Sequence, residues 1–411
     1  MNVLVLNPGS ATLKFGLYEM PELTEASTPT NSATVLANGL VERIGTPQSE
    51  LRMLVATQKP VVEPIEANTP AHAVEQIIRR LLAYVGENSQ TPMAIDAVGC
   101  RVVHGGARLV EPTRVTPSVL EELRALKELA PLHIPADVAV LERVQQSLPE
   151  IPVIAVFDTA FHQTLPEVAS TYALPFELSA RYGLRRYGFH GISHSYVSGR
   201  LIERLGRGEK GTRIITCHLG SGASVCAVRD GQSIDTSMGL TPMEGLVMST
   251  RSGDVDPGLV LYLIRTVGMT PSEVDDLLNH QSGLRGLSGL SGDLRDLEQA
   301  AQEKDKRAEL ALEIFAYRTC KYIGAFAAAL KGLDAVAFTG GIGEHSASMR
   351  RRICRGLEFL GLRLEDERNR AAIGRAEMQI GVEGGAVQIW VIPTDEEREI
   401  ASSTQKYCRS L

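Results

Sequence analysis

The sequence predicts an α/β protein of two duplicated domains, each with a mixed β-sheet flanked by helices. A strand–turn–strand pattern with a small-residue turn occurs at residues 3–15 and again at 214–226. After each copy the chain changes from hairpin patterns to alternating strands and helices, as α/β domains do. With 411 residues the chain is also long for a single core. We expect one domain at 1–158 together with 397–411, and a second at 159–396.

The first half should begin with hairpins and continue with strands and helices. Apolar runs bounded by turn residues indicate strands, and apolar residues at helical spacing indicate helices. Thr116 followed by Pro117 is typical of a helix start. The expected elements are strands at 3–6, 15–18 and 34–41, a helix at 73–84, a strand at 97–103, a helix from Pro117, and a strand at 151–157 that ends next to Asp158.

The second half should repeat this order after a loop-rich stretch. Asp230-Gly231 is a two-residue hairpin signal. The expected elements are a strand from Ile214, a strand at 223–229, a long helix at 310–330, and strands at 335–339 and 388–392. Segments rich in glycine, serine and charged residues should form long loops at 185–194, 235–257 and 282–296. Ordering such loops costs entropy, which favours a binding role.

Composition excludes several classes of function. The net charge of −7 argues against nucleic acid or an anionic membrane as the main partner. The helical run at 310–330 contains Glu313, Arg318 and Lys321, which a membrane span would not tolerate. The six cysteines contain no Cys-x-x-Cys pair and read as free thiols in a reducing compartment. With no signal-peptide pattern, we expect a cytoplasmic protein without a membrane segment.

Glycine-rich turns are the candidate phosphate-binding features. Turns without bulky side chains let an anion approach backbone N–H groups closely. Two such turns, at 7–12 and 218–222, suggest two halves that hold one polyphosphate. A third cluster, Gly340-Gly341-Ile342-Gly343, follows a buried strand and would place a nucleotide at a helix N-terminus. Its spacing matches neither the dinucleotide fingerprint nor the Walker loop.

Single polar residues identify little chemistry alone, since Asn7, Lys14 and Arg101 would each suit a purely structural role. The segment 185–194 is more informative because it combines two arginines, two histidines and two glycines. A transferring phosphoryl group spreads negative charge over three oxygens, which such residues can stabilise. We interpret this segment as part of a phosphoryl-transfer site.

Several longer motifs resemble the acetate kinase family, which belongs to the superfamily of sugar kinases, actin and the seventy-kilodalton chaperones. The motifs occur in the family order over essentially the whole chain. They are Arg101-Val-Val-His104-Gly-Gly, Ala130-Pro-Leu-His133, Phe157-Asp158-Thr-Ala-Phe-His162, Arg186-Tyr-Gly-Phe-His190-Gly, Thr250-Arg251-Ser-Gly-Asp254-Val-Asp256-Pro and Pro393-Thr-Asp-Glu396-Glu. The resemblance implies the actin-like ATPase fold, with an active site in the cleft between the domains, and a homodimer.

The resemblance also implies a role for each matching residue. The metal ligands would be Asn7 and Glu396, and the catalytic residues Asp158, His190 and Arg251. The substrate site would contain Arg101, Val103, Leu132, His133, Phe189 and Pro242. The ATP site would contain Lys14, His218, Leu219, Gly220, Ser221, Gly222, Asp293, Leu294, Arg295, Gly341, Ile342, Gly343, Glu344 and His345.

The implied reaction is reversible in-line transfer of the ATP γ-phosphoryl group to acetate, giving acetyl phosphate and ADP, with Mg²⁺ or Mn²⁺. Two arginines suit it because their planar forks bind carboxylate and phosphoryl oxygens in pairs. A small carboxylic acid, with a pKa of about 4 like that of Asp or Glu, is already ionised at neutral pH. The acceptor therefore needs no general base, and we expect Asp158 to position other groups.

Departures from the family pattern leave alternatives open. Pro8, Ala11, Thr12 and Ile134 replace usual residues, and so do Ser221 (usually Asn) and His345 (often Asn) at the nucleotide edge. The alternatives are propionate or a longer acid as acceptor, pyrophosphate as phosphoryl partner, and a non-catalytic nucleotide switch. Val103 favours the small acid, because propionate-preferring relatives carry a smaller residue there. The presence of Arg101, His190 and Arg251 disfavours the switch.

Overall fold

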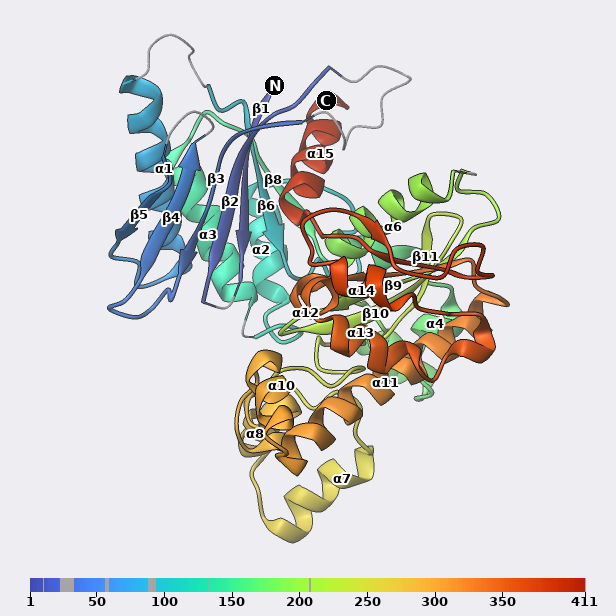
Figure 1. The fold of residues 1–411 in the computed structure, drawn as a ribbon. Helices are drawn as coiled ribbons and strands as arrows, with labels where there is room; N and C mark the ends of the chain where they lie inside the picture. The colour runs from blue at the N-terminus through green and yellow to red at the C-terminus, as the bar shows by residue number, and fades with distance from the viewer. Residues whose placement is uncertain are drawn as a thin grey trace. The chain divides into compact units, whose positions relative to one another are not determined.

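The chain forms two compact units, Met1–Ala160 with Asp395–Leu411 and Phe161–Thr394. The computed structural model describes residues 1–9, 11–22, 33–55, 59–87, 94–131, 133–206 and 208–410. Each unit contains one mixed β-sheet with helices packed on it (Figure 1). The predicted fold class is thereby confirmed.

The sheet of the first unit has eight strands in the order β5-β4-β3-β2-β1-β6-β8-β7. The strands are β1 (Asn2–Pro8), β2 (Leu13–Glu19), β3 (Thr34–Glu42), β4 (Glu50–Val55), β5 (Val61–Pro64), β6 (Ala97–Val102), β7 (Thr113–Arg114) and β8 (Val153–Phe157). The helices are α1 (Pro70–Glu87), α2 (Pro117–Ala125), α3 (Ile134–Ser147) and α15 (Glu396–Arg409). Strand β1 pairs antiparallel with β2 and parallel with β6, which pairs parallel with β8. The carboxyl ends of β1, β6 and β8 therefore lie at one edge.

The two faces of this sheet are covered by different helices. Leu4 and Leu6 of β1 share a buried core with residues of α1 and α3, such as Ile77. Side chains alternate along a strand, so Val5 and its partner Gly99 face the other side. Helix α15 lies on that side, where a Cβ on Gly99 would meet Thr404 and Ile400 (Figure 1). The C-terminal segment is thus part of the first unit.

Gly99→Ala should destabilise the protein by about 1–3 kcal/mol, as overpacking a core does. The added Cβ would lie 2.3 Å from Thr404 Oγ1 and 2.8 Å from Ile400 Cγ2, both on α15. Gly324→Ala is the control: a Cβ there meets nothing within 4 Å. Alanine in place of this mid-helix glycine should not destabilise the fold. Thermal and urea unfolding of both variants checks this. Equal stability of the two would contradict the close packing of α15.

The sheet of the second unit has six strands in the order β11-β10-β9-β12-β14-β13. The strands are β9 (Arg213–Leu219), β10 (Ala223–Arg229), β11 (Gln232–Thr236), β12 (Ala335–Thr339), β13 (Met378–Gln379) and β14 (Gln388–Val391). The main helices are α6 (Gly191–Leu205) and α11 (Lys306–Leu330). Ile214, Cys226 and Val228 share a core with Val197 and Leu201 of α6. Alternate positions of β9 and β10 therefore face α6.

Shorter elements connect these parts. They are η1 (Ala160–Thr164), α4 (Glu167–Ser170), α5 (Phe176–Tyr182), α7 (Pro257–Tyr262), the π-helical turn η2 (Leu263–Val267), α8 (Pro271–His280), α9 (Gly283–Ser288), α10 (Leu294–Gln302), α12 (Gly340–His345), α13 (Ala347–Cys354), η3 (Glu358–Leu360) and α14 (Asp366–Ala371). Nowhere in the described ranges is a helix both long and apolar enough to cross a bilayer.

Several predicted elements are confirmed. The strands at 223–229 and 335–339 have their expected bounds. Thr116 caps α2 by accepting the N–H of Val119. The long helix begins at Lys306, four residues early, because Asp305 accepts the N–H groups of Arg307 and Ala308.

All three predicted loops are wrong in part, the loop at 235–257 only at its ends, where Asp235 and Thr236 belong to β11 and Pro257 begins α7. Residues 191–194 are the first turn of α6, and 283–288 form α9. Left-handed residues bound both helices: His190 has φ +56° before α6, and Gly289 has φ +68° after α9. Glycine and serine look like loop formers in sequence, but burial of Ile192 and Leu284 stabilises these turns as helix.

Candidate active site

The first predicted turn joins β1 and β2. Gly9 N–H donates to the Thr12 carbonyl at 2.8 Å, which closes the turn. Asn7 and Lys14 lie opposite each other in the ladder, so both project near the carboxyl end of β1. Ser10, in the same turn, lies outside the described residues. The sequence thus places an amide and an ammonium group side by side at this sheet edge.

Two carboxylates of α15 approach Asn7. The Asn7 amide nitrogen donates to Glu396 at 2.9 Å and to Glu397 at 2.8 Å. Burial raises the pKa of Glu397, although the charge of Lys14 lowers it. Both acids lie in the first turn of α15, where the helix dipole favours negative charge. Glu396 was predicted; Glu397 was missed, although it is the next residue in the same motif.

This group supplies only hard oxygen donors beside an amide, which suits Mg²⁺. Mg²⁺ usually keeps several waters and takes one or two protein carboxylates. No cluster of three or more His, Cys, Asp or Glu that could hold a metal occurs among the residues with described positions. Carboxylate and amide oxygens are hard donors, the ligand type that hard divalent cations prefer over nitrogen or sulfur.

Arg101 and Asp158 form a buried pair at the same sheet edge. Arg101 is the next-to-last residue of β6 and Asp158 follows β8, and the two strands run parallel. The Arg101 Nε donates to Asp158 Oδ2 at 3.0 Å, Nη2 donates to the same oxygen, and Nη1 donates to the Pro8 carbonyl at 2.7 Å. Burial opposes the charge, but Asp158 and Glu396 together raise the pKa of Arg101. The guanidinium is held in one orientation.

Asp137 is a buried acid that the sequence interpretation missed. It lies on α3, one turn after His133, and accepts the Val103 N–H at 2.9 Å. Burial raises its pKa to about 7, against the Val103 hydrogen bond and Arg101, which lower it. An isolated acid on an apolar helix stripe was the available signal. Asp137 thus fixes the backbone of Val103, which is a predicted substrate residue. Leu132, also a predicted substrate residue, lies outside the described residues.

The raised pKa of Asp137 predicts a pH-dependent stability. The folded state binds a proton that the unfolded chain releases near pH 4, so stability should fall as pH rises from about 4 to about 7. Asp137→Asn keeps an acceptor for the Val103 N–H and should remove this part of the slope. Unfolding temperatures of both proteins between pH 4.5 and 8 check this. A stability difference independent of pH would contradict it.

In the second unit His190, Arg251 and Gly222 come together. His190 adopts the left-handed region at φ +56°, which is strained for a residue other than glycine. A Cβ on Gly222 would lie 3.1 Å from His190 Nε2 and 3.8 Å from Arg251 Nη1. The imidazole stacks on His218, with ring centroids 4.3 Å apart. One ring nitrogen and one guanidinium nitrogen thus face the same small space beside the glycine turn.

The neighbouring substrate candidates are partly tied to this group. Arg251 Nη1 donates to the Pro242 carbonyl at 3.2 Å. Phe189 is buried, and its carbonyl is 3.0 Å from His162 Nε2, which must donate to it. Arg251 and His190 are thus two side chains of the second unit that can donate to an oxyanion or a phosphoryl group.

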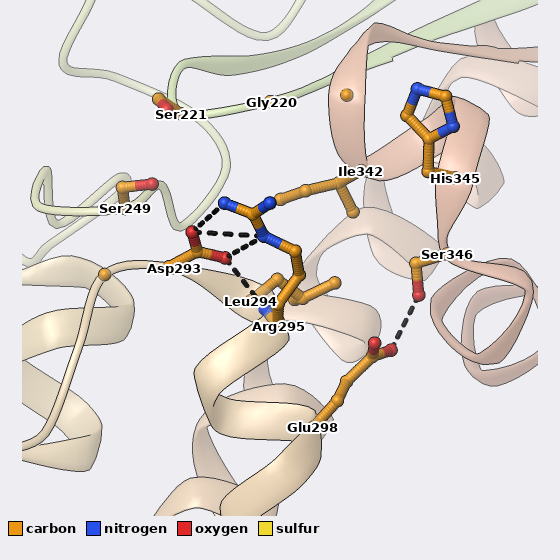
Figure 2. Close-up of a pocket in the computed structure, with 12 residues that line it drawn as sticks. Gly220, Ser221, Ser249, Asp293, Leu294, Arg295, Glu298, Ile342, His345 and Ser346 are labelled. Carbon is orange, nitrogen blue, oxygen red and sulfur yellow. Dashed lines mark hydrogen bonds and ion pairs between the residues drawn. The ribbon is translucent and has the colours of Figure 1, made fainter. Parts of the chain in front are cut away.

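A cavity of about 550 Å³ lies next to the second glycine turn (Figure 2). Eight of the predicted ATP-site residues line it: Gly220, Ser221, Asp293, Leu294, Arg295, Gly341, Ile342 and His345. Four lining residues were missed: Ser249, Gly292, Glu298 and Ser346. Glu298 accepts from Ser346 Oγ at 2.7 Å (Figure 2), a pairing across 48 residues that no local pattern reveals.

Five other predicted ATP-site residues of this unit do not line the cavity. They are His218, Leu219, Gly222, Gly343 and Glu344. Glu344 instead accepts the N–H groups of Gly340 at 2.9 Å and Thr394 at 3.1 Å. Its carboxylate therefore supports the turn after β12.

Asp293, which lines the cavity, accepts hydrogen bonds from Arg295 in a two-point ion pair (Figure 2). This pair lowers the pKa of Asp293.

Known proteins match the chain over nearly its full length. The acetokinase family profile matches residues 2–402. The acetate kinase of Bacteroides fragilis is 45% identical over 406 residues, covering 98% of both chains. The crystal structure of Porphyromonas gingivalis acetate kinase superposes with a TM-score of 0.86 at 41% identity and covers 99% of both chains. A propionate kinase from Francisella tularensis superposes with a TM-score of 0.88 at 38% identity, covering 98% of this chain and 99% of its own. This chain belongs to the acetokinase family.

Proposed function

We propose that the protein is an acetate kinase that transfers the γ-phosphoryl group of ATP to acetate, giving acetyl phosphate and ADP. The observation that carries the proposal is the convergence of His190 Nε2 and Arg251 Nη1 on Gly222, in a chain of this family. Two donors beside a glycine turn suit a group whose negative charge is spread over three oxygens. The carboxylate acceptor is ionised at neutral pH and needs no base.

The roles that the family motifs imply assign each part of the substrate to particular residues. Arg101 would bind the acetate carboxylate, with its fork oriented by Asp158. Arg251 and His190 would bind the transferring group. His133 would lie beside the bound acetate. The methyl group of acetate would contact Val103, Leu132, Phe189 and Pro242. The first unit would then form the carboxylate-binding domain and the second the nucleotide-binding domain.

The nucleotide would occupy the cavity of about 550 Å³, a size typical of small-molecule sites. Glycine turns at 220–222 and 340–343 would approach the phosphates, and Lys14 would also bind phosphate. Mg²⁺ would be held by Asn7, Glu396 and Glu397, where it would offset the phosphate charge. Ser221 and His345 replace asparagines usual in the family, so a donor panel of ATP, GTP and pyrophosphate on Ser221→Asn and His345→Asn would define the donor.

The test is direct. Protein, ATP, Mg²⁺ and acetate with hydroxylamine should yield acetohydroxamate from trapped acetyl phosphate, and omission of acetate should abolish it. Absence of hydroxamate with a folded protein would overturn the proposal and revive the non-catalytic nucleotide switch.

Propionate is the alternative acceptor, favoured by the likeness to the Francisella propionate kinase. One methylene changes discrimination by only about 1–3 kcal/mol, so overlapping activities are expected. Comparing kcat/KM for acetate, propionate and butyrate decides between them. A preference for propionate would overturn the choice of acetate.

We also propose a homodimer that acts in the cytoplasm. The apolar segment of α7 and η2 has no buried residue, and it exposes Leu259, Leu261, Tyr262 and Val267. Contiguous exposed apolar residues are typical of interfaces. Light scattering of the protein and of Leu261→Glu measures the oligomeric state.

The proposed cytoplasmic location is supported by the cysteines. All six are free thiols, as in a reducing compartment.

A further inference from the structure

A buried line of hydrogen bonds connects His190 to the interior of the second unit. His190 Nδ1 is 2.9 Å from Ser224 Oγ. The same hydroxyl is 2.8 Å from His194 Nε2, and His194 Nδ1 is 2.7 Å from Thr216 Oγ1. Thr216, His194 and Ser224 are each fully buried, at 0% exposure. One serine hydroxyl therefore serves two imidazoles.

The strand pattern explains how these groups meet. Ile214 of β9 and Val228 of β10 face the apolar part of α6. Two and four residues further toward the glycine turn, the same face carries Thr216 and Ser224. His194 lies one helical turn after His190 and reaches both hydroxyls. The line is thus the polar end of an otherwise apolar helix–sheet interface.

Counting protons fixes the direction of the line. His194 is neutral, since burial above all, with smaller effects of His162 and His218, places its pKa well below the ordinary value. A neutral imidazole carries one N–H, and a hydroxyl carries one O–H. Either Thr216 donates to His194, His194 to Ser224 and Ser224 to His190, or all three bonds run in reverse.

The Thr216 hydroxyl decides between these two directions. It makes no hydrogen bond other than that to His194 in the described part of the chain. If His194 donated to Thr216, the hydroxyl proton of Thr216 would be buried without an acceptor, at a cost of about 1–3 kcal/mol. If Thr216 donates to His194, every N–H and O–H of the line has an acceptor. Ser224 then donates to His190 Nδ1, so the ring proton of neutral His190 resides on Nε2.

We infer that Ser224 is a positioning residue that sets the tautomer of His190 and so makes Nε2 a hydrogen-bond donor. Nε2 is the nitrogen that faces Gly222 and Arg251 Nη1. The inference rests on the proposed phosphoryl transfer, in which that N–H would donate to the transferring group. Without Ser224 the neutral ring could place its proton on Nδ1 and present a lone pair to an anion instead.

This arrangement has a consequence for pH dependence. With Ser224, His190 donates from Nε2 whether its ring is neutral or cationic. Without Ser224, donation from Nε2 depends more on the protonation of the ring, so activity should fall as rising pH deprotonates the imidazole. Ionisable groups near His190 in the described part of the chain include His218 of β9, His194 of α6 and Arg251 of the loop between β11 and α7.

The first experiment compares Ser224→Ala with Ser233→Ala. Ser233 Oγ bonds His162 Nδ1 at 2.8 Å, so both variants remove a buried Ser–His hydrogen bond. The tautomer of His162 is fixed independently by the Phe189 carbonyl. Ser224→Ala should lower kcat about 10- to 100-fold, with little change in KM for either substrate. This is less than the loss of about 10²–10³-fold typical of deleting one oriented donor, because part of the His190 population still carries its proton on Nε2. The rate of Ser224→Ala should also fall with rising pH, while Ser233→Ala keeps the wild-type profile.

A second pair tests the line at a distance from His190. Thr216→Val keeps the shape of the side chain but removes the hydroxyl that sets the direction, and Thr216→Ser keeps the hydroxyl. The valine variant should lose kcat and the serine variant should retain it. This pair still decides if Ser224→Ala does not fold. Equal kcat for the two, or equal kcat for Ser224→Ala and Ser233→Ala, would overturn the inference.

Nitrogen-15 NMR of histidine-labelled protein supplies a readout without turnover. The His190 signal, assigned with His190→Gln, should report a protonated Nε2 and an unprotonated Nδ1, and Ser224→Ala should mix the two forms. A protonated Nδ1 in the neutral wild-type ring would refute the inference even in an active kinase. A missing hydroxamate product with the expected NMR pattern would refute only the proposed function.

Discussion

Asp158→Asn is expected to lower kcat/KM for acetate about 10²–10³-fold, which is about 3–4 kcal/mol of transition-state stabilisation, because Arg101 loses the charged partner that orients it. The Asp158 carboxylate is 2% exposed and accepts two N–H groups of Arg101. Asparagine has the same shape but offers one acceptor oxygen, and its NH₂ group would repel the guanidinium. Arg101 would then lose the orientation in which it binds a carboxylate.

The pH profile of Asp158→Asn separates positioning from proton transfer. If Asp158 only orients Arg101, the variant should be slower by a similar factor at every pH between 5.5 and 9. A displaced or lost ionisation limb would instead assign Asp158 a proton-transfer role. Asp137→Asn is the matched control, since it replaces another buried acid near Arg101, one that carries its negative charge only above about pH 7, without removing a hydrogen bond to Arg101. Its kcat/KM should stay within a few-fold of wild type.

The buried strands were predictable from sequence, and the reason is local. Strands such as β12 and β10 are mainly apolar runs bounded by glycine or charged turns, with Ser224 as a polar exception in β10. Helices α6 and α9 were not predicted, because they begin with glycine, serine and histidine and depend on burial against distant strands. Local patterns therefore determined the sheets better than the helices that position the site.

The candidate site was predictable where residues lie in compact motifs. Arg101 lies near the carboxyl end of β6 and Asp158 follows the parallel strand β8; the sequence alone placed Arg101 in a buried strand and Asp158 at a strand end. Asp137 and Glu298 were missed because each is an ordinary helical acid whose meaning depends on the residue opposite it. Ser224 was missed for the same reason: only the pairing of β10 with β9 and α6 brings its hydroxyl between two imidazoles.

Gly222→Ala is expected to lower kcat by at least about 10²-fold with the fold intact. The backbone at Gly222 lies outside the left-handed region, so alanine needs no conformational change there. Its methyl group would lie 3.1 Å from His190 Nε2 and 3.2 Å from His190 Cε1, between the imidazole and Arg251. It would occupy the space that the two donors face. Each oriented donor to a developing charge raises kcat about 10²–10³-fold. The methyl group would push the transferring phosphoryl group away from His190 and Arg251 and so weaken the hydrogen bonds from both.

Gly341→Ala is the comparison that makes this result specific. Gly341 lines the cavity of the second unit, and a Cβ there meets nothing within 4 Å. Its methyl group should alter KM for ATP more than kcat, whereas the methyl group of Gly222→Ala should mainly alter kcat. Steady-state kinetics with acetate and ATP varied separately, together with unfolding temperatures, distinguishes the two. Unchanged kcat in a folded Gly222→Ala protein would show that His190 Nε2 and Arg251 Nη1 do not meet the reacting group beside this turn.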